Sequence, residues 1–300
     1  MKYKSIFKLC LLTTFLSVAT ISCDDWTEME IHDSQVNGFK EQNPQEYAVY
    51  TQNLRAYKAT KHAVVYARLD NAPEVSTSEK DFLRALPDSI DIVTMRNADR
   101  LSEYDREDMK LVREDYGTKV LYYIDCTAKD KQNTSITSAV EAVRTGTFDG
   151  IALGSEGSAV DVSVLKPLVD ALGQTPCLLV FEGTPSLLPE AQRSLFNYFV
   201  LDISAASDEY DIETSVLYAT GYGKAAPDRL LLAVTPDGTL TDNNGVTRNA
   251  IAGAAYGALN METPLGGIAI YNISADYYDT DIIYKQTRGG IQFLNPASVH

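Results

Sequence analysis

The chain has 300 residues, 45% of them hydrophobic, which is ordinary for a globular protein with a sizeable core. Its 26 basic and 41 acidic residues give a formal net charge of −15. This acidity disfavours nucleic acid, which requires a basic face, and adhesion to anionic lipid headgroups; solubility explains the charge without any partner.

The first 22 residues have the pattern of a secretory signal peptide. Lys2 and Lys4 precede a largely apolar run over residues 6–21, which is too short to span a membrane well. Residues 20–23, Thr-Ile-Ser-Cys, resemble a loose bacterial lipobox. This resemblance implies that Cys23 is lipidated and becomes the mature N-terminus. A plain secretory signal with an incidental cysteine is the alternative.

Residues 23–43 are polar and are expected to tether one domain, residues 44–300, to the membrane. Asp24 and Asp25 resemble the acidic export signal of Bacteroidetes surface lipoproteins, which implies an outer-membrane protein that faces the cell exterior. Residues 44–61 carry apolar side chains at three-to-four spacing, which predicts a helix. We expect this helix to close the bottom of the domain that follows it.

From residue 62 onward, apolar runs alternate with amphipathic stretches. Near-continuous apolar strands covered by helices are typical of a parallel sheet. Eight such units predict a compact (β/α)8 TIM barrel, and a doubly wound open sheet is the main alternative. The predicted strands are His62–Leu69, Asp91–Asn97, Lys119–Asp125, Phe148–Glu156, Pro176–Gly183, Tyr198–Ser204, Arg229–Thr235 and Gly267–Ser274. The predicted helices include Glu103–Tyr116, Ile136–Thr145, Val162–Leu172, Pro189–Asn197, Glu209–Tyr222 and Arg248–Leu259.

Several classes of site lack support in the sequence. No Gly-x-Gly-x-x-Gly follows the first strand, so no nucleotide cofactor is predicted. The three histidines, His32, His62 and His300, lack metal-like spacing, and neither a metal site nor a Ser-His-Asp triad is expected. Cys126 and Cys177 are expected to stay unpaired. Residues 236–247 form either a binding loop or a plain exposed loop.

The fourth predicted strand ends in an isolated acid. By alternation, Ile151 and Leu153 share one face, while Gly150, Ala152, Gly154 and Glu156 share the other. In a parallel barrel the C-terminal ends of the strands carry the chemistry. Glu156 is therefore the leading candidate for a catalytic or ligand-binding acid, although an acid at such a position can also simply bond to a loop.

This strand resembles the signature Asp-Gly-x-Asp-x-Asp-x-Glu of glycoside hydrolase family 18, the chitinases and endo-β-N-acetylglucosaminidases. Asp149, Gly150 and Glu156 match its first, second and last positions, whereas Ala152 and Gly154 replace the two central aspartates. The resemblance implies a (β/α)8 barrel in which Glu156 is the catalytic acid. Residues 119–125 and 266–273 are similar to the third and eighth strands of the family.

The departure at Gly154 bears on activity. Family members use the 2-acetamido oxygen of the substrate as the nucleophile, so a second carboxylate must orient the acetamide and stabilise the oxazolinium ion. Gly154 has no side chain for this role, and no tyrosine lies near the end of the sixth strand. By alternation, Asp125 could approach Glu156 and replace the missing group; it could equally be a cap or loop residue.

Further ligand-binding candidates lie at or beyond strand ends. Tyrosine rings can stack on sugar faces while their hydroxyls form hydrogen bonds, although most tyrosines pack in cores. Glu182 and Asp202 end strands and can contact ligand or serve the structure. The candidates are Tyr123, Glu182, Asp202, Tyr271, Asn272, Tyr277 and Tyr278.

Together these features predict a cell-surface lipoprotein that recognises glycans containing N-acetylglucosamine, with impaired or absent hydrolase activity. Its partners would be the glycan, the membrane through Cys23, and proteins of an outer-membrane glycan-uptake system; no cofactor is required. One alternative is an active endo-β-N-acetylglucosaminidase with Glu156 as acid/base. Another is a structural or partner-binding lipoprotein with a vestigial pocket.

Overall fold

The computed structural model describes residues 39–72, 76, 78–127, 132–173 and 175–296. The signal peptide, Cys23 and most of the predicted tether lie outside these residues. The chain falls into two compact units, residues 1–48 and 49–300. The first two described helices are α2 (Phe39–Gln42) and α3 (Pro44–Lys58).

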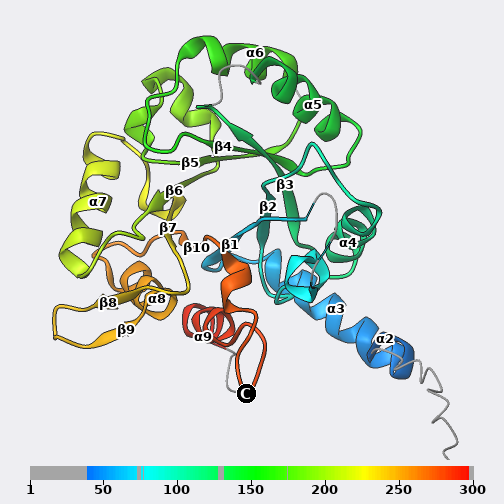
Figure 1. Cartoon of the computed structure of the whole chain (residues 1–300). Coiled ribbons are helices and arrows are strands. Elements are labelled where there is room, and N and C mark those ends of the chain that lie inside the picture. Colours follow the sequence, from blue (N-terminus) through cyan, green and yellow to red (C-terminus); the bar gives the residue numbers. More distant parts are fainter. Residues whose placement is uncertain (1–38, 73–75, 77, 128–131, 174, 297–300) are drawn as a thin grey trace, which may run out of the picture. The chain divides into compact units, whose positions relative to one another are not determined.

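Residues 49–300 contain a closed barrel of eight parallel strands (Figure 1). Neighbouring strands around the barrel follow the order β1-β10-β7-β6-β5-β4-β3-β2, which confirms the predicted (β/α)8 fold. The strands are β1 (Val64–Leu69), β2 (Ile92–Met95), β3 (Lys119–Asp125), β4 (Gly150–Gly154), β5 (Leu178–Glu182), β6 (Tyr198–Asp202), β7 (Leu230–Val234) and β10 (Gly267–Ile270).

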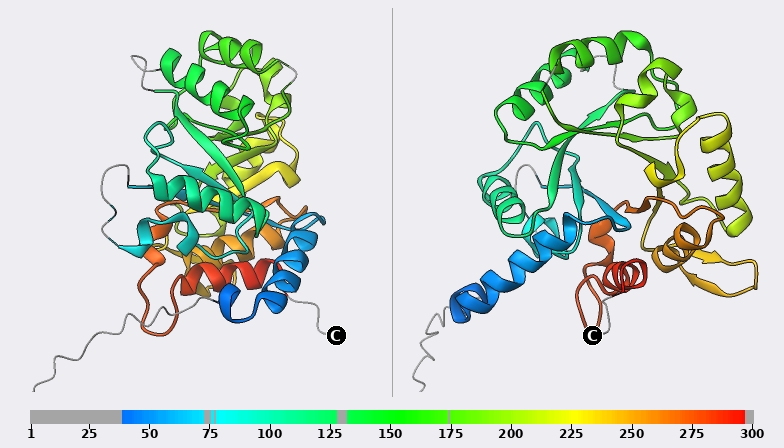
Figure 2. Two further views of the ribbon diagram at one scale, coloured as in Figure 1. Left: turned by 90° about the vertical axis from the view of Figure 1, so that its right-hand side faces the viewer. Right: turned by 180° about the vertical axis from the view of Figure 1, so that it is seen from behind.

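Helices surround the barrel in both further views of Figure 2. They are α4 (Glu103–Glu114), α5 (Gln132–Arg144), α6 (Val162–Leu172), α7 (Glu209–Gly221), α8 (Ala250–Asn260) and α9 (Lys285–Leu294). Short 3-10 helices complete the connections: η1 (Glu79–Asp81), η2 (Leu83–Ala85), η3 (Pro185–Leu187), η4 (Glu190–Leu195), η5 (Pro227–Arg229) and η6 (Ile273–Asp276).

Side-chain caps fix where several helices begin. At α4, the Ser102 hydroxyl accepts a hydrogen bond from Asp105 N at 3.0 Å, and the Asp105 carboxylate accepts one from Ser102 N at 2.8 Å. Such a capping box satisfies backbone donors that the first helical turn leaves unpaired. Asp161 and Asp208 cap α6 and α7 in the simpler way, with one side-chain acceptor each.

The structure differs from the sequence-based expectation in three segments. Residues 189–197, predicted as an α-helix, contain the 3-10 helix η4 instead. Residues 236–247, predicted as a loop, form most of a hairpin of β8 (Thr239–Thr241) and β9 (Thr247–Asn249) that leads into α8. Helix α9 was not among the predicted helices.

The barrel interior is packed with side chains. Alternation along the strands sends one set inward and the other toward the helices, which produces two apolar clusters. Strand β4 contributes only small side chains to the inside, so larger rings from other strands fill the space. The inner cluster contains Tyr66, Tyr123 and Tyr271 together with aliphatic residues such as Leu121, Val180 and Leu231.

The N-terminal end of the barrel is not closed by α3. The Lys58 ammonium donates to Asp88 O and Ile90 O at 2.6 Å, and this attaches the end of the helix to the barrel. A cavity of about 1060 Å³ nevertheless lies there, lined by Lys58, His62 and Asp91 among others. The helix thus borders this end without filling it.

No helix among the described residues has the length and apolar character needed to cross a membrane.

Candidate functional site

Glu156 lies outside strand β4, in an exposed turn. The strand ends at Gly154, and Ser158 N donates to Ser155 O at 2.8 Å to close the turn. Glu156 has φ = 44° and Gly157 has φ = 77°, both in the left-handed region. The alternation that would place Glu156 on the inner face therefore stops two residues before it. Its carboxylate forms no hydrogen bond or ion pair with a described residue.

The space beside Gly154 is filled by Tyr123. A Cβ atom built on Gly154 would lie 2.1 Å from the Tyr123 hydroxyl oxygen and 2.6 Å from its ring carbon Cζ. Real Cβ atoms do not approach other atoms this closely. Tyr123 itself is buried, and the Arg96 guanidinium lies 4.6 Å from its ring centroid. An aromatic ring thus occupies the position at which the family 18 signature places its second carboxylate.

Two acids flank Gly154 on the neighbouring strands. In the register of the sheet, Gly154 pairs with Asp125 of β3 on one side and with Glu182 of β5 on the other. Asp125 accepts hydrogen bonds from Thr127 N at 2.8 Å and from the Thr127 hydroxyl at 2.6 Å. Asp125 therefore caps its own loop, as its alternative interpretation predicted, and the described hydrogen bonds of its carboxylate go to Thr127.

Glu182 is the buried carboxylate at the C-terminal end of the barrel. Its Oε1 accepts from the Tyr66 hydroxyl at 2.5 Å, and its Oε2 lies 3.1 Å from Arg68 Nη1. The Tyr66 hydroxyl also bonds to Thr94. Burial raises the pKa of Glu182, and the Arg68 charge and the Tyr66 hydrogen bond act in the opposite direction.

Arg68 connects Glu182 to the ring of Tyr271. Its guanidinium carbon lies 3.6 Å from the Tyr271 ring centroid, which is a cation–π contact. Burial, together with the Glu182 charge, raises the pKa of both Tyr66 and Tyr271 well above the ordinary tyrosine value. The phenols are therefore neutral hydrogen-bonding groups. We call Tyr66, Arg68, Glu182 and Tyr271 the barrel-end cluster.

The remaining predicted residues lie at different places. Asp202 accepts from Ser204 N at 2.9 Å and from the Ser204 hydroxyl at 2.6 Å, which repeats the arrangement of Asp125. Tyr277 is buried and its hydroxyl bonds to Glu79, whereas Tyr278 is 70% exposed beside it. Asn272 has a left-handed backbone, with φ = 49°, and is exposed.

Asp149, which matches the signature, lies at the opposite end of the barrel. Its Oδ2 accepts from Val120 N at 2.9 Å, and its Oδ1 accepts from Arg113 Nη2 at 3.1 Å. These bonds tie the start of β4 to β3 and α4. Asp149 therefore has a structural role far along the strand from Glu156.

Sequence reasoning missed Tyr66, Arg68 and Thr94 as parts of the site. The signal was available, since Tyr66 and Arg68 alternate inward on the predicted first strand. It was overlooked because no motif marks them. Among the described residues, no group of three or more histidine, cysteine, aspartate or glutamate side chains could hold a metal ion.

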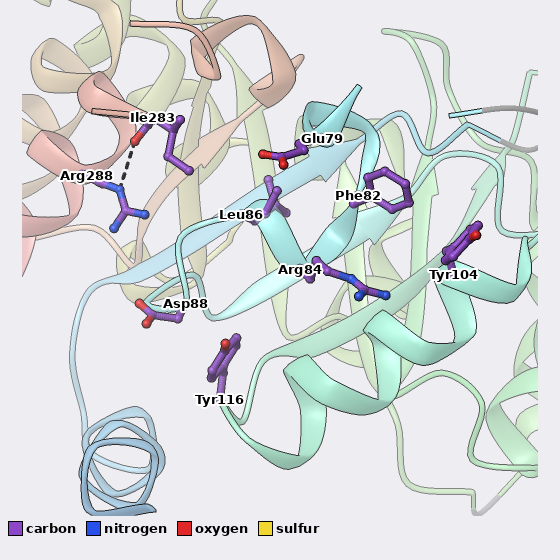
Figure 3. A pocket seen from close by; sticks show the side chains of 10 residues that line it. Glu79, Phe82, Arg84, Leu86, Asp88, Tyr104, Tyr116, Ile283 and Arg288 are labelled. Atoms are coloured by element: carbon purple, nitrogen blue, oxygen red, sulfur yellow. Dashed lines mark hydrogen bonds between the residues drawn. The ribbon is translucent and has the colours of Figure 1, made fainter. Parts of the chain in front are cut away.

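A separate pocket of about 560 Å³ lies on the outside of the barrel (Figure 3). It is lined by six residues of the β1–β2 connection, by Tyr104 and Tyr116 near the two ends of α4, and by Ile283 and Arg288. The six are Glu79, Phe82, Arg84, Ala85, Leu86 and Asp88. Arg288 Nε donates to Ile283 O at 3.0 Å. No residue singled out in the sequence lines this pocket, so it is distinct from the barrel end.

Comparison with known proteins shows which folds and families the chain resembles. Residues 27–145 match the model of glycoside hydrolase family 18, BT1044-like. The matched segment ends before β4 and so includes neither Gly154 nor Glu156. A search of the curated proteins found no match.

Solved structures show the same type of barrel. BT1044, in a selenomethionine form with a Glu-to-Gln substitution, has a TM-score of 0.71 at 18% identity, covering 86% of this chain and 95% of that one. An endo-β-N-acetylglucosaminidase mutant from Cordyceps militaris, bound to fucosyl-N-acetylglucosamine-Asn, has a TM-score of 0.58 at 16% identity, covering 82% and 95%. A family 18 chitinase from Pseudoalteromonas aurantia has a TM-score of 0.58 at 13% identity, covering 77% and 100%.

Proposed function

We propose that the chain is a family 18 member that binds a glycan containing N-acetylglucosamine and does not hydrolyse it. The observation that carries this proposal is the Tyr123 ring beside Gly154. Substrate assistance requires a carboxylate there to stabilise the oxazolinium ion, and losing a group that stabilises transition-state charge typically costs about 10²–10³ in rate. Glu156 lies in an exposed turn beyond the end of β4 and not on the strand itself.

Binding, unlike hydrolysis, needs no second carboxylate. The family match over residues 27–145 and the ligand named for the Cordyceps militaris structure favour an N-acetylglucosamine-containing glycan. Tyr278 offers a 70% exposed ring that packs against Tyr277 in a T-shaped contact, with ring centroids 4.8 Å apart. A ring fixed in this way can stack on a sugar without a large entropic cost.

The signal-peptide and lipobox patterns at the N-terminus favour a location for this protein at the outer membrane. A lipid on Cys23 would anchor the protein in the outer membrane, and the acidic residues after it favour the exterior side. A glycan-binding lipoprotein at this place would deliver glycans to uptake proteins of the same membrane. Labelling of Cys23 with a radioactive or alkyne-bearing fatty acid tests the anchor, and Cys23→Ser is the control.

The first experiment measures glycan release. The purified chain and its Glu156→Gln and Glu182→Gln variants are incubated with an N-linked glycoprotein, beside an active chitinase-family enzyme, and released glycans are read by mass spectrometry. We expect no release by any form of this chain. Release by the wild type that either variant abolishes would overturn the proposal in favour of an endo-β-N-acetylglucosaminidase.

The second experiment measures binding by calorimetry with the same glycans. We expect saturable heat with the wild type and affinity about 3–10-fold lower for Tyr278→Ala, corresponding to the loss of one stacked ring. Tyr104→Ala, which removes a 58% exposed tyrosine on α4, is the matched control and should bind normally. Absence of heat with every glycan would leave a structural or partner-binding role.

A further inference from the structure

A charged groove lies on the outside of the barrel between α4 and the connection from α5 to β4. Its volume is about 490 Å³, and its charged lining residues are Arg106, Lys110, Arg113, Glu114, Lys119 and Asp149. Four cations and two acids give the lining a formal charge of +2, in a chain whose net charge is −15. The groove is therefore a local reversal of the protein's overall charge. We call it the cationic groove.

One of the two acids is already neutralised within the protein. Asp149 binds Arg113 through two nitrogens, Nε at 2.9 Å and Nη2 at 3.1 Å, and accepts Val120 N at 2.9 Å. Such a two-pronged pair is geometrically specific and fixed in place. Arg113 and Asp149 thus form a rigid floor with no net charge, and the remaining lining cations are opposed by one acid, Glu114.

The remaining cations are directed by helix geometry. Arg106, Lys110 and Arg113 are spaced by four and three residues, which puts them on one face of α4. Lys110 is exposed and forms no hydrogen bond or ion pair with a described residue. Lys119, on β3, has a 57% exposed side chain and lies 3.9 Å from Asp149, so its contact with that carboxylate is weak.

Arg106, which also lines the groove, is bonded to the start of its own helix. Its Nη1 donates to Leu101 O at 2.9 Å and to Ser102 O at 3.1 Å. These bonds use one nitrogen and reduce the freedom of the side chain. A partly immobilised guanidinium loses less entropy when it binds an anion than a free one would. Thr147 also lines the groove, and its hydroxyl bonds to the Thr145 hydroxyl at 3.1 Å.

We propose that the cationic groove binds a phosphate group. A phosphate monoester carries about −1.5 to −2 charges and three strong acceptor oxygens. Its charge matches the formal +2 of the lining, and its three oxygens can accept hydrogen bonds from donors on separate elements. A carboxylate would neutralise only half of that charge. The groove shares no residue with the barrel-end cluster, so this proposal is independent of glycan binding there.

The test titrates pyrophosphate into the full chain at constant ionic strength, followed by ³¹P NMR and calorimetry. The wild type should bind saturably. Lys110→Glu combined with Arg106→Glu should weaken binding at least tenfold, because both attraction and donors are lost. Lys166→Glu combined with Lys224→Glu makes the same change of net charge at exposed lysines elsewhere and should leave binding intact.

Two outcomes would overturn the proposal. One is no saturable binding by the wild type, and the other is equal weakening in both double variants, which would show an effect of net charge alone. Circular dichroism and thermal unfolding identify a variant that fails to fold; Lys110→Gln, which removes one charge without reversing it, then serves as the groove variant and should weaken binding severalfold.

A parallel arm identifies the source of the phosphate. The chain is sedimented with phosphatidylcholine vesicles with and without phosphatidic acid, a lipid phosphate monoester, at the same ionic strength. Where pyrophosphate binds, sedimentation that requires phosphatidic acid and is lost in the groove variant assigns the site to a lipid headgroup. Pyrophosphate binding without sedimentation assigns it to a soluble phosphate ester. Absence of saturable pyrophosphate binding overturns the proposal, whatever the outcome of the glycan experiments.

Discussion

The hydroxyl oxygen of Tyr123 lies 2.1 Å from the position that a Cβ atom on Gly154 would occupy. The two residues lie on the adjacent strands β3 and β4. Because the Tyr123 side chain fills the space beside position 154, only glycine, which has no Cβ atom, fits there. Under the proposed relationship to family 18, the assisting carboxylate would have to begin at that atom.

Gly154→Asp should destabilise the protein by at least about 3 kcal/mol, since overpacking costs about 1–3 kcal/mol and a buried, unpaired charge adds to it. Tyr123→Ala alone should cost about 3–5 kcal/mol through the cavity that it leaves. The double variant should cost less than the sum, with a coupling of at least about 1 kcal/mol. Urea unfolding of the four proteins measures this cycle.

The matched control for that cycle is Gly289→Asp, on α9, where a Cβ atom would meet nothing within 4 Å. It should change the free energy of unfolding by less than about 0.5 kcal/mol, as exposed substitutions do. Strict additivity of the Gly154 and Tyr123 substitutions would contradict the steric relationship.

Arg68→Met should destabilise the protein by about 3–5 kcal/mol at pH 7, because it leaves the Glu182 carboxylate buried without its cation. Adding Glu182→Gln should recover most of that loss, since no charge then remains to be buried. Chemical unfolding of both variants tests the pair.

The same variant should respond to pH. Burial raises the pKa of Glu182 in the folded protein, and removing Arg68 removes an opposing influence. A carboxyl with a raised folded pKa takes up its proton more readily when folded, so the stability of Arg68→Met should rise as pH falls through that pKa toward the ordinary value near 4.3. A penalty that stays constant between pH 7 and pH 5 would contradict this account.

His62 should contribute more stability in acid than in base. Its Nε2 lies 3.0 Å from Asp91 Oδ1, and the two side chains are 9% and 11% exposed. The hydrogen bond to Asp91 is the main cause that raises the pKa of His62. The stabilisation is therefore complete below the unfolded pKa of about 6.5 and is lost as pH rises through the folded pKa.

His62→Gln should thus cost about 1 kcal/mol at pH 6 and less at pH 9, as measured by urea unfolding at each pH. Two stability curves that run parallel across this range would mean that the imidazole is not charged in the folded protein.

Glu156→Gly should stabilise the protein by up to about 1 kcal/mol, because φ = 44° is strained for a residue with a Cβ atom and free for glycine. Ser158→Gly, in the same exposed connection but without a positive φ, should instead lose a few tenths of a kcal/mol or more. Thermal unfolding compares the two. A loss of stability in Glu156→Gly would indicate that the Glu156 carboxylate holds the turn.

The sequence predicted the barrel well because its eight apolar runs lie at nearly the residues that form strands. Alternation also explains the placement of Tyr123 inside the barrel. The same alternation does not extend beyond the end of β4 at Gly154, because Glu156 and Gly157 have a left-handed backbone conformation. A period of two describes strand residues and gives no information about the side on which a turn residue lies.

Other parts of the site depend on contacts between segments distant in the chain. Glu182 is paired by Tyr66 and Arg68, more than 110 residues earlier, and no local pattern connects them. Tyr277 follows the last strand, as a ligand contact would, but the β1–β2 connection brings Glu79 to its hydroxyl and buries it. Such pairings follow from tertiary packing and are not visible in a single sequence.

The fit of Tyr123 against Gly154 also constrains how this protein could change over evolutionary time. An aspartate at position 154 is accessible only after the tyrosine has been replaced by something small, and that first replacement leaves a costly void. Each of the two substitutions alone is expected to lower the stability of the protein, and the aspartate costs less once the ring is gone. The chain is therefore held in its present form by an epistatic barrier, and selection for glycosidase activity would have to cross it by a compensating change elsewhere.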